Sequence, residues 1–398
     1  MTKKLSAGYG ETVITPPLGL ELCGYGFYLN RRAESVLDDI KARAVYLKHD
    51  SGDLILVSCD ILGFTIERSD EIRRKISDTF RVPLKNILLA CTHTHTAPTV
   101  QYLPGLGEPD PAYQASLPDA VCKAVEQAAN DLRDAGFSYA AQAVEPIGYN
   151  RRLGNFVDVD PFLKSGVFKR DGGSIYLLNY ACHAVTLGRS TQVSADWPGA
   201  LARRLEKDGH RALVFQGFCG DLDPVVFMNH WGGGTGEDLR LYGDLLADRL
   251  AKSEKGAKQP ADIRLAAAEQ RFRIPLSVCR KDEIDAEAAF FLEKNKAFPL
   301  ADRFAEEWRQ TAHERHREFW SKPYLDDVPV QALAVGDWKL VALPGEVFCR
   351  FGLNLGKEFP GLMTAGYANG NIGYLPHASA FEDTGDYACY CAPRFYTV

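Results

Sequence analysis

The sequence lacks the features that mark several large classes of protein. No run of about 18 apolar residues is present that would cross a bilayer, and the two lysines near the N-terminus precede no apolar core of a secretory signal. The net charge is −6, and no basic patch is interleaved with aromatic residues. The charge gives no reason to expect a nucleic acid or an anionic membrane as partner. The missing apolar run gives no reason to expect stable membrane insertion.

Paired cysteine motifs are also missing. The ten cysteines form no Cys-X-X-Cys pair, and the closest two, Cys389 and Cys391, do not have the spacing of a zinc ribbon. We interpret them as reduced thiols, most of them small core residues, in a cytoplasmic protein. A secreted protein whose signal has been removed is the alternative.

Length and composition are those of a large globular enzyme. The 398 residues exceed the roughly 250–300 at which a single core stops growing, and the 46% hydrophobic and 25% charged residues are ordinary values. The chain is therefore one large layered domain or two tightly joined ones. We expect a single domain over 1–398, with a helical excursion at about 281–320.

Alternating strand and helix patterns predict an α/β fold with mixed β-sheets flanked by helices. We expect hairpins at 44–59 and 329–343, the second turning at Gly336-Asp337, and helices at 66–80, at 113–135 and from Asp196, with Asp196 as N-cap, through Arg204.

One segment is the most informative. The apolar run Ile87–Cys91 ends in Thr92-His93-Thr94-His95. On an extended backbone this spacing places both imidazoles on one side of the chain, about 7 Å apart at the Cα atoms, and imidazole is the commonest side-chain ligand of zinc. The pair alone leaves two interpretations open: a metal site, or two histidines held by hydrogen bonds in a polar loop.

Three further segments carry chemically useful groups, two of them at strand ends and one in a loop. A second apolar strand, Ile175–Tyr180, leads to His183. The sequence Leu343-Pro344-Gly345-Glu346 ends another strand and places Glu346 in the first turn of an expected helix. A loop rich in glycine and asparagine carries Tyr374. Taken singly, Glu346 would be an ordinary helix carboxylate and Tyr374 a buried tyrosine with a satisfied hydroxyl.

Together these motifs resemble the neutral/alkaline (non-lysosomal) ceramidase family, whose members are zinc amidases. The matching pieces are Thr-His-Thr-His, Asn-Tyr-Ala-Cys-His, Gly220-Asp221, Leu-Pro-Gly-Glu and the loop from Ala-Asn to Tyr, in the family's order. The resemblance implies the family's α/β catalytic domain. It covers that domain only, as in a short bacterial-type member, because the chain ends soon after the last motif with no room for the family's C-terminal immunoglobulin-like module.

The resemblance also implies roles for individual residues. It assigns zinc (Zn2+) ligation to His93, His183, Glu346 and Tyr374. Two imidazoles and a carboxylate match the three-ligand plan of a catalytic zinc, which leaves a coordination position for water.

Catalytic roles follow from the same comparison. His95 corresponds to the family's non-ligand catalytic histidine, which would stabilise the oxyanion or pass a proton to the leaving amine. Arg151 corresponds to an arginine near the substrate carbonyl, with Arg152 as its rival. Tyr387 corresponds to a tyrosine near the same oxyanion, if the alignment takes a one-residue gap.

One position departs from the family's pattern. Where ceramidases have Gly-Asp-Val-Ser-Pro, this chain has Gly220-Asp221-Leu222-Asp223-Pro224. Asp223 cannot act as an activated hydroxyl, so a metal-activated water is favoured as nucleophile. A carboxylate here also favours a soluble amide with an amine or hydroxyl group over ceramide.

We therefore predict a zinc-dependent hydrolase of a carbon–nitrogen amide bond whose partner is a small-molecule amide substrate. Three alternatives stay open at this point: a zinc esterase or lactonase, true ceramide hydrolysis, and a catalytically silent binding homologue.

Overall fold

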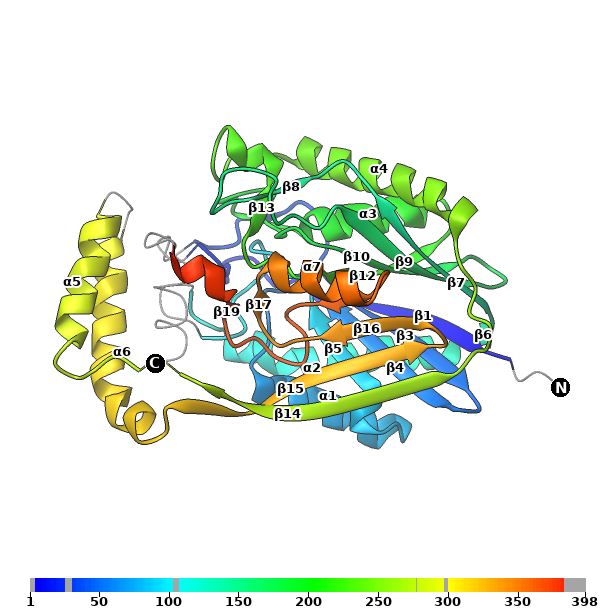
Figure 1. Ribbon diagram of the computed structural model, residues 1–398, viewed down its shortest axis with the longest axis horizontal. Coiled ribbons are helices and arrows are strands. Elements are labelled where there is room, and N and C mark those ends of the chain that lie inside the picture. Colours follow the sequence, from blue (N-terminus) through cyan, green and yellow to red (C-terminus); the bar gives the residue numbers. More distant parts are fainter. Residues whose placement is uncertain (1–3, 26–30, 103–106, 277, 297–299, 383–398) are drawn as a thin grey trace.

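Three β-sheets form the centre of the protein, and helices cover the outer faces of the first two (Figure 1). The computed structural model describes residues 4–25, 31–102, 107–276, 278–296 and 300–382. Both parallel and antiparallel strand pairs occur. The predicted class, mixed β-sheets flanked by helices, is confirmed.

The first sheet carries the strand that leads to His93. Its order is β5-β4-β3-β1-β6, in which β4 and β5 are parallel and the other neighbours antiparallel. β3 and β4 form the hairpin predicted at 44–59. The strands are β1 (Ser6–Val13), β3 (Lys41–His49), β4 (Gly52–Cys59), β5 (Ile87–Cys91) and β6 (Arg133–Asp134).

The second sheet carries the strand that leads to His183. Its order is β12-β10-β9-β7, and β10 runs parallel to β12. Because parallel strands end at the same edge, the segments after β10 and β12 meet there, which is where ligands bind in many α/β proteins. The strands are β7 (Gly136–Ala143), β9 (Phe162–Lys169), β10 (Ile175–Tyr180) and β12 (Arg211–Gln216).

The third sheet has the order β14-β15-β16-β18, with β16 and β18 parallel. It contains the hairpin predicted to turn at Gly336-Asp337. Its strands are β14 (Leu265–Pro275), β15 (Tyr324–Val335), β16 (Trp338–Ala342) and β18 (Met363–Ala365).

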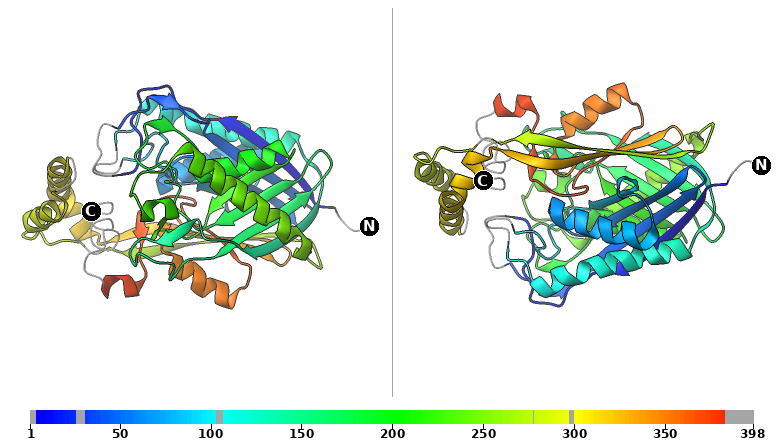
Figure 2. Two further views of the ribbon diagram at one scale, coloured as in Figure 1. Left: turned by 90° about the horizontal axis from the view of Figure 1, so that it is seen from above. Right: turned by 90° about the horizontal axis from the view of Figure 1, so that it is seen from below.

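A pair of helices, α5 (Ile284–Asn295) and α6 (Ala301–Ser321), is inserted between β14 and β15. The two helices stand at one end of the long axis (Figures 1 and 2). They pack on each other through an apolar cluster of their own, which includes Phe291, Phe304 and Trp308. The predicted excursion at about 281–320 corresponds to this pair.

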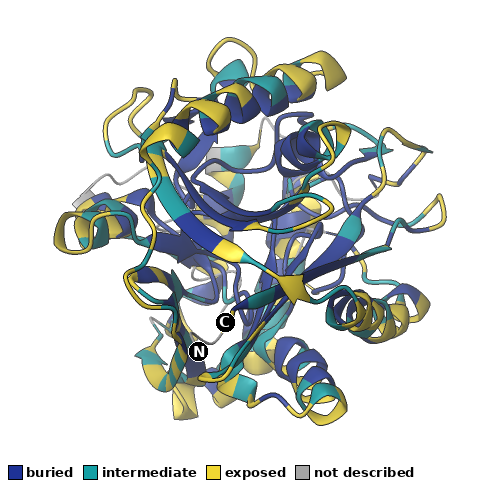
Figure 3. Ribbon diagram, turned by 90° about the vertical axis from the view of Figure 1, so that its right-hand side faces the viewer, coloured by how far each residue is buried: buried dark blue, intermediate teal, exposed yellow. Residues whose placement is uncertain are grey.

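Alternating residues of the central strands bury both sheet faces. On β3, Val45 and Leu47 enter a cluster shared by all three sheets, whereas Ala44 and Tyr46 enter a cluster beneath α1 (Ile66–Phe80) and α2 (Pro111–Asn130). The outer face of the second sheet is covered by α3 (Asp196–Lys207) and α4 (Gly236–Ser253). Figure 2 shows these helix pairs on opposite sides, and Figure 3 shows the buried strands between them.

The remaining elements are short. They are strands β2 (Ser35–Val36), β8 (Gly148–Asn150), β11 (Gln192–Val193), β13 (Leu222–Pro224), β17 (Glu346–Val347) and β19 (Tyr374–Leu375), helix α7 (Cys349–Glu358), and single turns η1 (Leu84–Asn86), η2 (Val225–Met228), η3 (Glu254–Gly256) and η4 (Ala378–Glu382). Within the described ranges, no helix combines the length and the apolarity that crossing a membrane requires.

Several predicted boundaries were wrong. The helix predicted at 113–135 is α2, which ends at Asn130 because Arg133 and Asp134 pair with β1. Asp196 is the first residue of α3 and not its N-cap, and its carboxylate accepts the backbone N–H groups of Trp197 and Thr186. Glu346 lies in β17, so it precedes α7 and is not in its first turn.

Candidate metal centre

His93 is held in an unusual backbone conformation at the end of β5. The strand ends at Cys91, and His93 has φ 60°, a left-handed conformation that costs a non-glycine residue about 1–3 kcal/mol. Its Nδ1 lies 2.8 Å from the carbonyl oxygen of Leu62, and Tyr367 stacks on its ring at 3.8 Å. The predicted extended backbone is therefore wrong here, although the His93 and His95 rings still approach to 4.9 Å.

His183 is fixed in a similar way after β10. It is fully buried, and its Nδ1 lies 2.8 Å from the carbonyl oxygen of Cys219 and 3.0 Å from that of Leu222. Both carbonyls belong to the segment that follows the parallel neighbour β12. Because Nδ1 donates to them, Nε2 carries the lone pair when the ring is neutral, the arrangement typical of a metal-binding histidine.

The Glu346 carboxylate lies between the two imidazoles. Its Oε2 is 3.4 Å from Nε2 of His93 and 3.2 Å from Nε2 of His183. Burial alone would raise the pKa of Glu346, but the adjacent His93 and His183 outweigh it and hold that pKa well below its usual range. The carboxyl group is therefore ionised, as a metal ligand must be.

These distances fit a tetrahedral ion. Two ligands that each lie about 2.1 Å from a tetrahedral zinc are roughly 3.4 Å apart, which matches both Glu346 contacts. In addition, Nε2 of His93 is buried without a hydrogen-bond partner among the described residues. Such an atom is rare in a native interior, and a metal would satisfy it. The residues present therefore fit a bound zinc.

His95 lies beside this group. Both of its ring nitrogens are shielded from solvent and have no hydrogen-bond partner in the described part of the chain. Burial, followed by the neighbouring His93 and His183, lowers its pKa well below the ordinary value, so the ring is neutral. Ligand atoms of these three histidines all lie within 4.8 Å of one another, a looser limit than the roughly 3.4 Å between two zinc ligands. We call His93, His95, His183 and Glu346 the imidazole cluster.

Arg151, Asp223 and Tyr374 form a second group, the arginine cluster. Arg151 follows β8, and its guanidinium donates to Asp223 Oδ1 at 3.2 Å and to the Tyr374 hydroxyl and the Gly220 carbonyl at 2.9 Å each. Tyr374 is the register partner of Glu346 in the β17–β19 pair. The short strands therefore place this group next to the imidazole cluster.

The rival arginine points elsewhere. Arg152 donates to the carbonyl oxygen of Ala380 at 3.3 Å and lies over the ring of Phe348. Of the two candidates, Arg151 is thus the one that contacts Tyr374. Tyr387 lies outside the described residues.

The sequence reasoning missed three residues around the histidines. Tyr367 stacks on His93, Tyr25 contacts the His95 ring edge-on at 5.1 Å, and the buried Arg31 donates to the carbonyl oxygen of His95. Tyr367 falls within the loop that carries Tyr374, so the loop itself was a signal. Nothing in the sequence around Tyr25 and Arg31 connects them with His95, 64 residues from Arg31.

Comparison with known proteins bears on the fold. No family model and no curated sequence matches this chain. The crystal structure of the neutral ceramidase from Pseudomonas aeruginosa superposes with a TM-score of 0.75 and 16% identity, over 98% of this chain and 71% of that one. The structure of a ceramidase complexed with C2 superposes with a TM-score of 0.71 and 16% identity, over 94% of this chain and 70% of that one. The chain therefore has the fold of neutral ceramidases across nearly all its length.

Proposed function

We propose that the protein is a zinc-dependent hydrolase that cleaves the carbon–nitrogen amide bond of an N-acyl amine. The observation that carries this proposal is the contact of one buried carboxylate, Glu346, with Nε2 of His93 and of His183, both tied at Nδ1 to backbone carbonyls. The shared fold with neutral ceramidases supports the same class of reaction.

In this proposal His93, His183, Glu346 and Tyr374 hold the zinc. When bound, the metal supplies a Lewis acid for the scissile carbonyl and lowers the pKa of the attacking water. The Tyr374 hydroxyl accepts a hydrogen bond from Arg151 at 2.9 Å. This bond stabilises negative charge on the phenol oxygen, which makes Tyr374 a better ligand.

His95 is proposed as the proton carrier. Its neutral ring has two nitrogens without a hydrogen-bond partner among the described residues, so it is able to accept a proton at one nitrogen and donate from the other. Tyr25 packs against the ring, and Gly24 leaves no room for a side chain there, because a Cβ atom would lie 2.2 Å from Nδ1 of His95. This packing fixes the ring in place for proton transfer to the leaving amine.

Arg151 is proposed to stabilise the oxyanion. Asp223 and the Gly220 carbonyl hold its guanidinium in place, so no reorganisation is needed when negative charge develops. Asp223 is thereby a positioning residue for Arg151. Because Asp223 is 4% exposed and paired, it is not a free carboxylate for the substrate.

This pairing weakens the sequence argument for a polar substrate. Asp221 is likewise engaged, with the backbone N–H of Cys349 at 2.8 Å and with Asn150 at 3.1 Å. Neither carboxylate is left to repel an apolar acyl chain. The proposal therefore names the N-acyl amine as the substrate class and includes ceramide in its test.

The test combines metal analysis with turnover. We expect about one zinc per chain, and hydrolysis of N-acyl amines that is lost on chelation and restored by zinc. Short N-acetyl amines, long-chain ceramide in detergent, lactones and esters are compared by kcat/KM. Turnover of esters or lactones with no amide cleaved would show that the protein is an esterase or lactonase and not an amidase. Full zinc content without turnover of any substrate would instead indicate a binding protein.

A further inference from the structure

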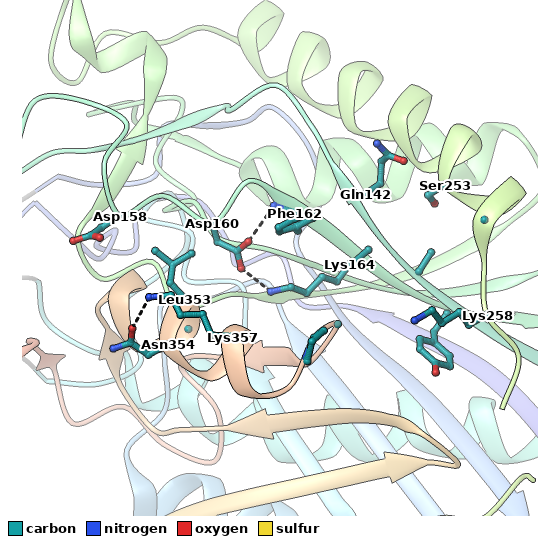
Figure 4. Close-up of a pocket in the computed structure, with 18 of the residues that line it drawn as sticks. Gln142, Asp158, Asp160, Phe162, Lys164, Ser253, Lys258, Leu353, Asn354 and Lys357 are labelled. Atoms are coloured by element: carbon teal, nitrogen blue, oxygen red, sulfur yellow. Dashed lines mark hydrogen bonds and ion pairs between the residues drawn. The ribbon is translucent and has the colours of Figure 1, made fainter. Parts of the chain in front are cut away.

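A cavity that is partly open to solvent lies apart from both clusters of the candidate site. Its volume is about 660 Å³, and it is lined by residues of β7, β9, the end of α4 with η3, and α7 (Figure 4). None of the residues proposed for zinc binding or catalysis lines it. Its size is that of a site for a small organic molecule.

The charge of this cavity is opposite to that of the protein. Five cationic side chains line it, against two carboxylates, Asp158 and Asp160, whereas the whole chain carries a net charge of −6. A local excess of positive charge in an otherwise acidic protein attracts anions. The cationic residues are Lys164, Lys252, Lys258, Arg350 and Lys357.

One of these cations is buried at the cavity wall. Lys164 is 6% exposed, and its Nζ donates to Asp160 Oδ2 at 2.6 Å, while Asp160 Oδ1 accepts the backbone N–H of Phe162 (Figure 4). An ammonium group has three donors. In the described structure Asp160 takes one of them, so two remain for a ligand.

The other cations differ in how they are paired. Arg350 forms an ion pair with Asp158 at 2.9 Å. Lys357 reaches only the neutral amide of Asn354, at 3.5 Å. No ion pair involving Lys258 is found within the described ranges. Lys258 and Lys357 therefore contribute positive charge that no carboxylate of the cavity neutralises.

Apolar groups form the rest of the wall. Phe162 is 41% exposed although it lines the cavity, and Tyr139 and Leu353 also line the cavity. On the α7 side, a Cβ atom added at Gly356 would meet nothing within 4 Å. This space and the exposed phenyl ring favour a ligand with an apolar body, since covering the ring removes apolar surface from water.

We propose that this cavity binds a small organic carboxylate with a short apolar chain. The carboxylate pairs with Lys164, the chain covers Phe162 and Leu353, and Lys258 and Lys357, which lie toward opposite ends of the cavity, add positive charge around it (Figure 4). This inference does not depend on the proposed hydrolase activity, because it uses a different set of residues.

Isothermal titration calorimetry of the zinc-loaded full chain with hexanoate tests the proposal. We expect binding of hexanoate at one site. Hexan-1-ol lacks the carboxylate and inorganic phosphate lacks the apolar chain, so each should bind at least ~10-fold more weakly. The double substitution Lys258→Ala with Lys357→Ala should weaken hexanoate binding roughly 10-fold or more. Lys48→Ala, at an exposed lysine on β3, is the matched control and should change nothing.

Four results would overturn the proposal. One is the absence of hexanoate binding. Another is binding that the double variant leaves unchanged. The third is binding that disappears when zinc is removed, because it would place the carboxylate at the metal. Equal affinity for hexan-1-ol would contradict the role of the lysines.

Discussion

The imidazole cluster and the arginine cluster lie side by side, but their polar atoms are paired very differently. In the first, Nε2 of His93 and both nitrogens of His95 have no hydrogen-bond partner among the described residues. In the second, Arg151 donates to a carboxylate, a carbonyl and a phenol. The described residues therefore leave polar atoms of the imidazole cluster open to a ligand, whereas the arginine cluster is organised before any ligand binds.

The difference has an energetic consequence. A buried polar atom without a partner costs about 1–3 kcal/mol, and the left-handed backbone of His93 adds to that cost. Metal binding would offset these terms, so the imidazole cluster is expected to couple metal binding to stability. Within the arginine cluster, Arg151 and Asp223 are not proposed zinc ligands, so substituting either is expected to affect the chemical step more than the metal content.

The largest effect is expected from the two imidazoles that contact Glu346. His93→Ala and His183→Ala should each remove the zinc and lower kcat/KM by at least ~10³-fold, because water and carbonyl lose their activation together. Zinc content by elemental analysis and turnover are measured on the same samples. His49→Ala serves as the control, because among the described residues the His49 side chain hydrogen-bonds only with Ser51. Full zinc in both variants would refute the ligand assignment.

Chelation tests the same cluster through stability. Removing zinc from the wild-type protein should lower Tm, and re-adding it at about 1,000 times its Kd should restore roughly 4 kcal/mol of stability. Differential scanning calorimetry with and without zinc measures the change. Arg151→Ala should keep most of the zinc-dependent part of Tm, since Arg151 is not a ligand and acts on the metal only through Tyr374. A wild-type Tm that does not respond to zinc would show that the nitrogens of His93 and His95 without hydrogen-bond partners do not form a metal site.

A smaller effect is expected for His95. His95→Ala should keep the zinc and slow the chemical step by about 10²-fold, the usual loss when one acid–base group is removed. Single-turnover kinetics and metal analysis separate the two effects. Loss of zinc from this variant would instead favour ligation by the three histidines, whose ligand atoms lie within 4.8 Å of one another.

The two arginines should differ. Arg151→Lys removes the fork that joins Asp223 to Tyr374 and should lower kcat about 10- to 100-fold with zinc retained. Arg152→Lys, the matched variant, should have a much smaller effect, because Arg152 points to Ala380 and Phe348. The reverse order of effects would exchange the roles assigned to the two residues.

The smallest effect is expected at Asp223. Asp223→Asn keeps the shape of the side chain but removes the charge that holds Arg151, and should cost a few-fold in kcat, equivalent to roughly 1 kcal/mol. A double-mutant cycle is the decisive measurement. If Asp223 acts only by positioning Arg151, its substitution should have no further effect in the Arg151→Ala background. Additive losses would mean that Asp223 contacts the substrate directly.

Much of the fold followed from local patterns. The hairpin of β3 and β4 and the exact span of α1 were predicted, because alternation and helical periodicity reflect which faces are buried. A predicted helix boundary was wrong where the segment pairs with a strand that is distant in sequence. Residues 131–135 continue the helical pattern of α2, but pairing of Arg133 and Asp134 with β1 ends the helix at Asn130.

For the site, the sequence by itself determined the chemical inventory. Motifs at strand ends contain His93, His183 and Glu346, a loop rich in glycine and asparagine carries Tyr374, and the resemblance to ceramidases implied that the four hold one zinc. Only the tertiary structure decided how these groups face one another. The Nδ1 partners of both histidines are carbonyls from other segments, and Arg151 instead of Arg152 reaches Tyr374 across 223 residues. Such contacts depend on how three sheets pack together, a long-range property that no window of sequence contains.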